Sequence, residues 1–299
     1  MHHSDNTRGA LLMVSAMSAF TINDAFMKAA AAELPLMQAT FWRGAMVVPC
    51  LMLVCRALGQ FRMNFPARDW KLLLIRTVGE MLSAIFFLTA LFNMPFANVS
   101  AILQSLPLTV SLAAAVFFGE PLGWKRLSAI FVGFIGVLLI VQPGGADFSI
   151  YSLSAVGCVV AATVRDLAAR RMSAQVPSTF AGLVAATGVM LMAAIGMIFE
   201  DSAPMTATSL TYLACAALFI IAAYVFSVSA MRVGEIGFVA PFRYISLLVA
   251  MLLGALVFGE IPSGMTLLGA GIVVATGLFT LYRERRRKRR LQPQSVRSV

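Results

Sequence analysis

The amino-acid sequence predicts an all-α integral membrane protein with ten transmembrane helices, arranged as two inverted repeats of five. Three observations predict this fold: an apolar composition, ten apolar stretches of membrane-spanning length, and a short motif that occurs twice. Of the 299 residues, 60% are hydrophobic and only 12% are charged, and the mean hydropathy is +0.87. Soluble proteins carry about 25% charged residues, so this chain lacks the polar surface that a water-soluble fold requires.

The ten apolar stretches are separated by polar residues, prolines and glycines. A bilayer core about 30 Å thick requires roughly 20 mostly apolar residues per helix. The first stretch is longer than the core of a signal peptide and contains Asn23 and Asp24, so we interpret it as a helix that stays in the protein. The ten expected spans are residues 10–30, 36–55, 71–92, 96–118, 124–142, 149–169, 179–199, 208–230, 237–258 and 264–282.

The distribution of Lys and Arg predicts the orientation of these spans. Basic residues concentrate in alternate connections and in a terminal run at 283–290, which we interpret as an anchor to anionic lipid and not to nucleic acid. Lys28, near the outer end of the first span, is the exception, and Glu33 is expected to offset it. We therefore expect a multi-pass protein of the bacterial inner membrane, with both termini in the cytoplasm and a disordered tail at 291–299. The outer connections without Lys or Arg are 93–95, 143–148, 200–207 and 259–263.

An internal repeat divides the chain into two halves. The segment Val-Phe-Phe-Gly-Glu-Pro at 116–121 recurs as Leu-Val-Phe-Gly-Glu-Ile-Pro at 256–262. Five spans is an odd number, so the second half must enter the membrane in the opposite sense. We expect one five-helix repeat at 1–145 and a second at 146–290, an arrangement that recurs in secondary transporters with a substrate site between the halves. Glycines that follow the two motifs are expected to permit close helix packing: Gly133, Gly136, Gly269 and Gly271.

The chain resembles the EamA branch of the drug/metabolite transporters in three features. These are ten spans as five plus five, the paired F-G-E turn after the fourth and ninth spans, and the short basic C terminus. The resemblance covers nearly the whole chain. Within that branch, the segments at 8–13, 23–28 and 90–95 are similar to bacterial members proposed as riboflavin importers. The resemblance implies a gradient-driven secondary transporter of a small organic metabolite that works by alternating access, with riboflavin uptake as the best single substrate.

Ionisable residues within the spans are costly in a bilayer, so each is a candidate for function. Asp24 on the first span and Arg43 on the second lie at similar depths, and we expect them either to pair or to contact the solute. Arg76 and Glu80 share one face of the third span. Protonation of Glu80 on one side of the membrane and release on the other would couple transport to protons; in a purely structural role, Glu80 would neutralise Arg76 or Arg243.

Arg243 is the favoured residue for solute contact, because a guanidinium is planar, donates hydrogen bonds and can stack on an aromatic ring. Arg165, Arg170 and Arg171 are instead interpreted as anchors at the inner face. Aromatic side chains offer stacking surfaces for a flat ring, although packing against lipid or protein is the alternative for each. The predicted substrate-binding residues are Arg243, Tyr244, Gln104, Arg43, Trp42 and Tyr224, and the predicted coupling or gating residues are Glu80, Asp24 and Arg76.

Several function classes lack their motifs in this sequence. It contains no G-x-x-x-x-G-K-[ST] phosphate-binding loop, and its two histidines are His2 and His3 in the N-terminal tail. We therefore expect no enzyme activity, cofactor or metal, with the solute, the lipid bilayer and protons as the candidate partners. The alternatives are an exporter of amino acids or toxic amphiphilic compounds, a membrane enzyme acting on lipid-linked substrates, and a non-transporting membrane scaffold. Direction, coupling ion and oligomeric state stay open.

Overall fold

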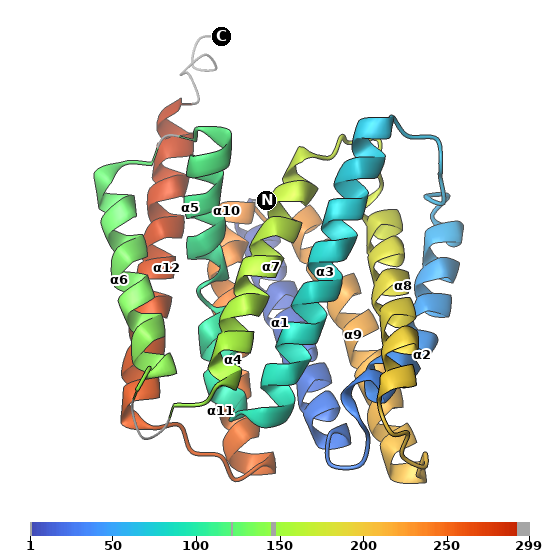
Figure 1. The fold of residues 1–299 in the computed structure, drawn as a ribbon. Coiled ribbons are helices and arrows are strands. Elements are labelled where there is room, and N and C mark those ends of the chain that lie inside the picture. The colour runs from blue at the N-terminus through green and yellow to red at the C-terminus, as the bar shows by residue number, and fades with distance from the viewer. Residues whose placement is uncertain (1, 121, 145–147, 292–299) are drawn as a thin grey trace.

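The computed structural model describes residues 2–120, 122–144 and 148–291, which form an upright bundle of helices without strands (Figure 1). Ten helical segments in this part of the chain are long and apolar enough to cross a membrane, as expected. In chain order the elements are α1 (His2–Ala30), α2 (Leu36–Ala57), α3 (Ala67–Asn93), α4 (Phe96–Leu103), α5 (Leu106–Phe118), α6 (Trp124–Val141), α7 (Tyr151–Arg171), α8 (Ser178–Gly196), the 3-10 turn η1 (Met197–Phe199), α9 (Ala207–Val233), α10 (Ile236–Val239), η2 (Ala240–Tyr244), α11 (Ile245–Val257) and α12 (Gly264–Leu291).

The fourth and ninth spans are interrupted, whereas continuous helices are expected from the sequence. The fourth consists of α4 and α5, with Gln104 and Ser105 between them, and Pro107 lies in the first turn of α5. Proline has no backbone N–H, so it cannot donate to the carbonyl of Leu103 four residues earlier, and α4 ends at that residue. In the ninth span, Pro241 lies in η2 between α10 and α11.

The first and last helices differ from expectation at their ends. Helix α1 begins at His2 and not near residue 10, and α12 continues through the basic run to Leu291. The expected disordered tail at 291–299 is therefore wrong at Leu291, and its remaining residues lie outside the described part of the chain. The described parts of the connections expected on the outer side lie together at the lower end of the bundle in Figure 1.

The helices pack in pairs that follow the proposed repeat. Helix α1 packs along α9, α3 along α7, α2 along α8, α6 along α12, and α4 against α11. If each span of the first half is exchanged with its counterpart in the second half, α1 changes places with α7 and α9 with α3. The α1–α9 pair then becomes the α7–α3 pair, and each of the other three pairs is unchanged. This pairing is what a two-fold relation between the halves would produce; the inverted relation and the boundaries 1–145 and 146–290 stay predictions.

Glycine allows the backbones of α6 and α12 to touch. A Cβ atom on Gly136 would lie 2.9 Å from the carbonyl oxygen of Gly269. The expectation of close packing is confirmed for these two residues, because only a residue without Cβ fits this contact. It is wrong for Gly271, where a Cβ would meet open space.

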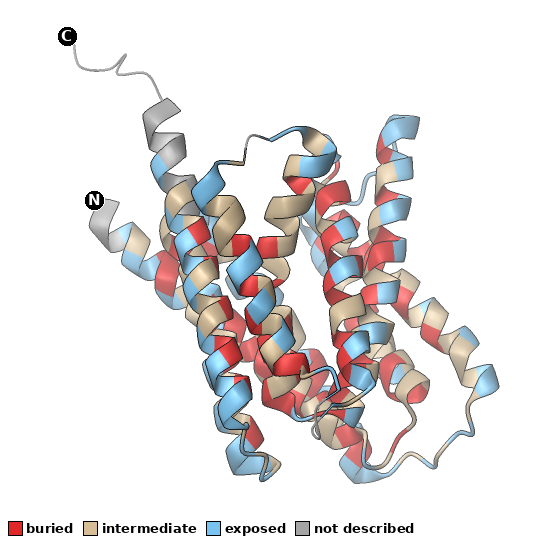
Figure 2. Ribbon diagram, turned by 60° about the vertical axis from the view of Figure 1, so that its left-hand side comes forward, coloured by how far each residue is buried: buried red, intermediate tan, exposed pale blue. Residues whose placement is uncertain are grey.

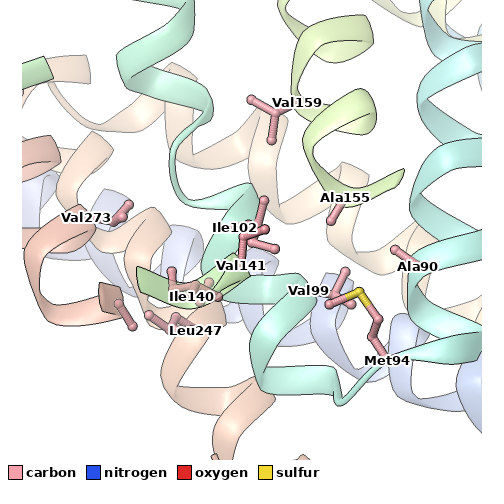
Figure 3. Packing of buried hydrophobic residues seen from close by; sticks show 12 residues of the cluster. Ala90, Met94, Val99, Ile102, Ile140, Val141, Ala155, Val159, Leu247 and Val273 are labelled. Carbon is pink, nitrogen blue, oxygen red and sulfur yellow. The ribbon is translucent and has the colours of Figure 1, made fainter. Parts of the chain in front are cut away.

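Buried residues line the inward faces of the helices and exposed residues their outward faces (Figure 2). One cluster of buried apolar side chains holds the two interrupted spans together: Val99 and Ile102 of α4 lie in it with Leu247 of α11 (Figure 3). Ile140 of α6 and Val273 of α12 belong to the same cluster, as do residues of α3 and α7. The apolar core therefore sets the mutual position of the two helix breaks.

Candidate functional site

Polar residues within the spans gather in two groups. The first, here called the central charge cluster, consists of Asp24, Arg43, Arg76, Glu80, Arg165 and Tyr224, which come from α1, α2, α3, α7 and α9. Tyr224 lies near enough to Glu80, Arg165, Arg43 and Arg76 for electrostatic interaction with each, so these side chains lie near one another. Five of the six members of the cluster were predicted as site residues, and Arg165 was not.

Asn23 connects Asp24 to Arg43. Its Nδ2 donates to Asp24 Oδ1 at 2.9 Å, and its Oδ1 accepts from Arg43 Nη1 at 3.4 Å. Asn23 is only 2% exposed, so water does not replace these bonds. Of the two alternatives expected for Asp24 and Arg43, a direct ion pair is not formed in this conformation: the Asn23 amide between them provides an acceptor for the guanidinium and a donor for the carboxylate, and solute contact stays a prediction.

Glu80 pairs with Arg165, against expectation. Arg165 Nη1 lies 3.5 Å from both Oε1 and Oε2 of Glu80, while its Nε donates to Asp166 Oδ1 at 2.8 Å. Arg76 instead donates from Nη1 to the carbonyl oxygen of Ala181 at 2.9 Å. The expectation that Glu80 would neutralise Arg76 or Arg243 is thus wrong. The interpretation of Arg165 as an anchor at the inner face is wrong as well.

The reason for this pairing is the close packing of α3 on α7. A Cβ on Gly79 would lie 3.1 Å from the backbone nitrogen of Arg165, so the helices meet beside Glu80. The repeat contained a signal that could have identified Arg165: Arg165-Asp166 lies about 140 residues after Asn23-Asp24, the same spacing as the two F-G-E motifs.

Tyr224 and Trp42 both remain accessible. The Tyr224 ring meets Phe20 edge to face with centroids 5.4 Å apart, and the residue is 41% exposed. Trp42 is 40% exposed and contacts the ring of Phe41 at 5.5 Å. Tyr224 joins the central charge cluster, whereas the contacts of Trp42 join it to neither polar group.

The second group, here called the helix-break group, lies where the two interrupted spans meet. Gln104 Nε2 donates to Ser246 Oγ at 2.7 Å, and Ser246 Oγ donates to the carbonyl oxygen of Arg243 at 3.0 Å. The Arg243 side chain is exposed and makes no hydrogen bond or ion pair with any residue that the structure describes. Its five N–H donors are therefore available to a solute. Ser246 was missed, because serine in an apolar span carries no distinctive sequence signal.

Tyr244 is packed into the bundle next to this group. It is 6% exposed, and a Cβ on Gly277 of α12 would collide with its ring. Its buried hydroxyl has no hydrogen-bond partner among the described residues. In this conformation Tyr244 thus contributes to the contact between η2 and α12, unlike the exposed guanidinium of its neighbour Arg243.

Lys28 pairs with Glu260, so the expectation that Glu33 offsets it is wrong. Lys28 Nζ lies 2.9 Å from Glu260 Oε1. Glu33 accepts a hydrogen bond from Thr206 instead. In the part of the chain that the structure describes, no three His, Cys, Asp or Glu residues are grouped to hold a metal ion.

Comparisons with known proteins agree with this architecture. The model of the EamA-like transporter family matches residues 7–142 and 149–282. The chain is 28% identical to a riboflavin transporter of Vibrio cholerae over 295 residues, 97% of each chain. It is 26% identical to the pseudopaline exporter CntI of Pseudomonas aeruginosa over 280 residues, 93% of this chain and 97% of the exporter. A crystal structure of a protein with 21% identity has the same fold, with a TM-score of 0.65 over 95% of this chain and 99% of the other.

Proposed function

Because the chain belongs to the EamA-like transporter family, we propose that it is a gradient-driven secondary transporter that moves a small organic metabolite across the bacterial inner membrane by alternating access. It is a multi-pass membrane protein, and the named relatives are small-molecule transporters. The positive-inside rule supports the proposal that both termini are cytoplasmic, since the outer connections lack Lys and Arg.

The observation that carries this proposal is the helix-break group. Discontinuous spans at matching positions of two repeats mark the solute sites of secondary transporters, because their free backbone groups and side chains can bind a solute at mid-depth. Here the breaks of the fourth and ninth spans meet through Gln104 and Ser246, and Arg243 offers unpaired donors beside them.

Riboflavin uptake is the proposed activity. The named Vibrio cholerae relative supports this choice, as does the chemistry of the accessible side chains. An isoalloxazine ring is flat and carries carbonyl and nitrogen acceptors, which suit the planar guanidinium of Arg243 and the exposed ring of Tyr224. The relative named as an exporter supports a second candidate, the export of a small organic metabolite.

Protons are the proposed coupling ion, with Glu80 as the group that binds them. Charge-assisted hydrogen bonds are usually about 2.7–2.9 Å long. The 3.5 Å contacts between Glu80 and Arg165 are longer, so protonation of Glu80 forfeits less interaction energy than it would in a tight pair. The neighbouring Asp166 continues to neutralise Arg165 when Glu80 is protonated.

The test is uptake of labelled riboflavin by a bacterial strain that can neither make nor import it, with and without this gene. We expect saturable uptake that is lost in Arg243→Ala. The matched control is Arg232→Ala, which removes an exposed guanidinium from the last turn of α9 and should retain uptake. Absence of uptake by well-inserted protein would exclude riboflavin as an imported solute and direct the search to exported metabolites.

A further inference from the structure

The second F-G-E motif forms a compact contact at the outer face. Besides the ion pair with Glu260, Lys28 donates to the backbone carbonyls of Leu91, at 3.3 Å, and Met94. The second carboxylate oxygen of Glu260 accepts from the backbone N–H of Phe96 at 2.7 Å. The pair therefore joins the end of α1, the end of α3, the start of α4 and the turn after α11. The side chains of Lys28 and Glu260 are 11% and 23% exposed.

The first F-G-E motif forms a similar but looser contact at the inner face. Arg170 Nη1 lies 3.6 Å from Glu120 Oε1, and these side chains are 47% and 49% exposed. The guanidinium carbon of Arg171 lies 4.0 Å from the centre of the Phe118 ring. In the outer contact, Lys28 Nζ likewise lies over a ring, 5.5 Å from the centre of Phe258. The single lysine of the outer contact is thus replaced by two neighbouring arginines at the inner face.

The two turns have the same backbone conformation. Gly119 and Gly259 both have φ of 66°, in the left-handed region that favours glycine. The N–H of each following glutamate, Glu120 or Glu260, bonds to the carbonyl six residues earlier, on Ala114 or Gly254. Each glutamate is thereby directed toward the last turn of a helix that occupies the same place in its half, α7 or α1.

We propose that Glu260 with Lys28 and Glu120 with Arg170 are paired closing contacts, the first closing the solute pathway at the outer face and the second at the inner face, in alternation. This inference rests on the alternating-access function proposed above. In the present conformation the outer contact is short and largely buried, and the inner contact is long and exposed, which corresponds to a carrier closed toward the outside.

The physical basis is the difference between buried and exposed ion pairs. An exposed pair at 3.6 Å contributes little to stability, because water solvates both charges. Removing one partner of a buried pair leaves an uncompensated charge, which strongly disfavours the closed state. Neutralising Glu260 should therefore shift the population toward the outward-open conformation, whereas neutralising Glu120 should not.

The test measures accessibility and does not depend on a substrate. In a full-length variant without its four native cysteines, the substitution Ala25→Cys, here called the outer reporter, lies in the buried cluster that includes Phe96 and Ala250. The substitution Val228→Cys, here called the inner reporter, lies one turn from Tyr224 toward the inner end of α9, at a position that is 41% exposed. Labelling rates are measured with a membrane-impermeant thiol reagent, from the outside for the outer reporter and from the inside, in inverted vesicles, for the inner reporter.

We expect Glu260→Gln to raise outside labelling of the outer reporter at least fivefold and to lower inside labelling of the inner reporter. Lys28→Ala should act in the same way, and Lys28→Arg, which keeps the charge, should retain slow labelling of the outer reporter. Glu120→Gln should also leave labelling of the outer reporter slow. The matched control is Glu200→Gln. Like Glu260, Glu200 accepts a hydrogen bond from the N-terminus of a helix, here from the N–H of Met37 at 2.9 Å. Because Glu200 belongs to neither closing contact, the labelling rates of both reporters should stay unchanged.

Two outcomes would overturn the proposal. Faster labelling of both reporters in Glu260→Gln would mean that the residue merely stabilises the fold, and unchanged labelling of both would mean that it does not control closure. Riboflavin uptake by the parent protein is assayed in parallel. Reporter shifts without uptake would reject the proposed solute and support the closing contacts, while uptake without reporter shifts would support the solute and reject the contacts.

Discussion

Arg165 Nη1 on α7 lies 3.5 Å from both carboxylate oxygens of Glu80, which is at the middle of α3. The same guanidinium donates from Nε to Asp166, so it has two acidic partners. This arrangement lets one of the two carboxylates become neutral without leaving an isolated buried arginine, a state that would be costly in a membrane.

Glu80→Gln should abolish stimulation of uptake by an imposed proton gradient, acid outside, while solute exchange across the membrane continues. The amide cannot bind and release a proton, but it keeps the shape of the side chain. Asp166→Asn is the control, since it removes the other acidic partner of Arg165 and should retain the stimulation. Gradient-driven uptake by Glu80→Gln would exclude Glu80 as the coupling group.

Gln104→Leu and Ser246→Ala should each weaken solute binding, and the double variant should lose less than the sum of the two. The 2.7 Å bond between Gln104 and Ser246 joins the two helix breaks, so either single change leaves a polar partner unsatisfied. A coupling energy of about 1 kcal/mol is expected from a double-mutant cycle on the solute Kd. Strict additivity would show that the two residues act independently.

Gly277→Ala should destabilise the protein by about 1–3 kcal/mol, because the new methyl group would overlap the Tyr244 ring in a packed contact. Gly271→Ala on the same helix meets open space and should be neutral or slightly stabilising. Thermal unfolding in detergent measures both changes. Tyr244→Phe should partly rescue Gly277→Ala, since it removes the hydroxyl that would be nearest to the new methyl. Equal Tm values for the two alanine variants would contradict the described packing.

Asn23→Leu should impair transport more than it impairs stability. The substitution removes the amide that joins Asp24 to Arg43, and leucine has a similar volume. Asp24 and Arg43 then need new partners within the span, which changes the charge that the pathway presents to the solute. Uptake kinetics and Tm are compared with those of Asn98→Leu, which replaces an asparagine of α4 outside the central charge cluster. Normal kinetics in Asn23→Leu would show that the amide connection has no part in transport.

The sequence could predict those features that depend on local chemistry. Hydropathy decides which stretches enter lipid, and the ten apolar helices lie within a few residues of the expected positions, apart from the longer ends of α1 and α12. The paired F-G-E turns and the basic connections are likewise recognised from the residues of their own segments. Pro107 and Pro241 lie at the breaks of matching spans of the two halves, but Pro49 lies inside α2 without interrupting it. A proline inside an apolar span therefore marks a candidate break, and the surrounding packing decides whether the helix is interrupted there.

Only the tertiary structure decided which charges meet. Glu80 has Arg76 one turn away on its own helix, and it pairs with Arg165, 85 residues further along the chain. Lys28 has Glu33 five residues away and pairs with Glu260. The physical reason is that a side chain's partner depends on which helices pack together and on how each is rotated about its axis. Those quantities arise from the summed packing of the whole bundle, whereas membrane insertion is decided span by span.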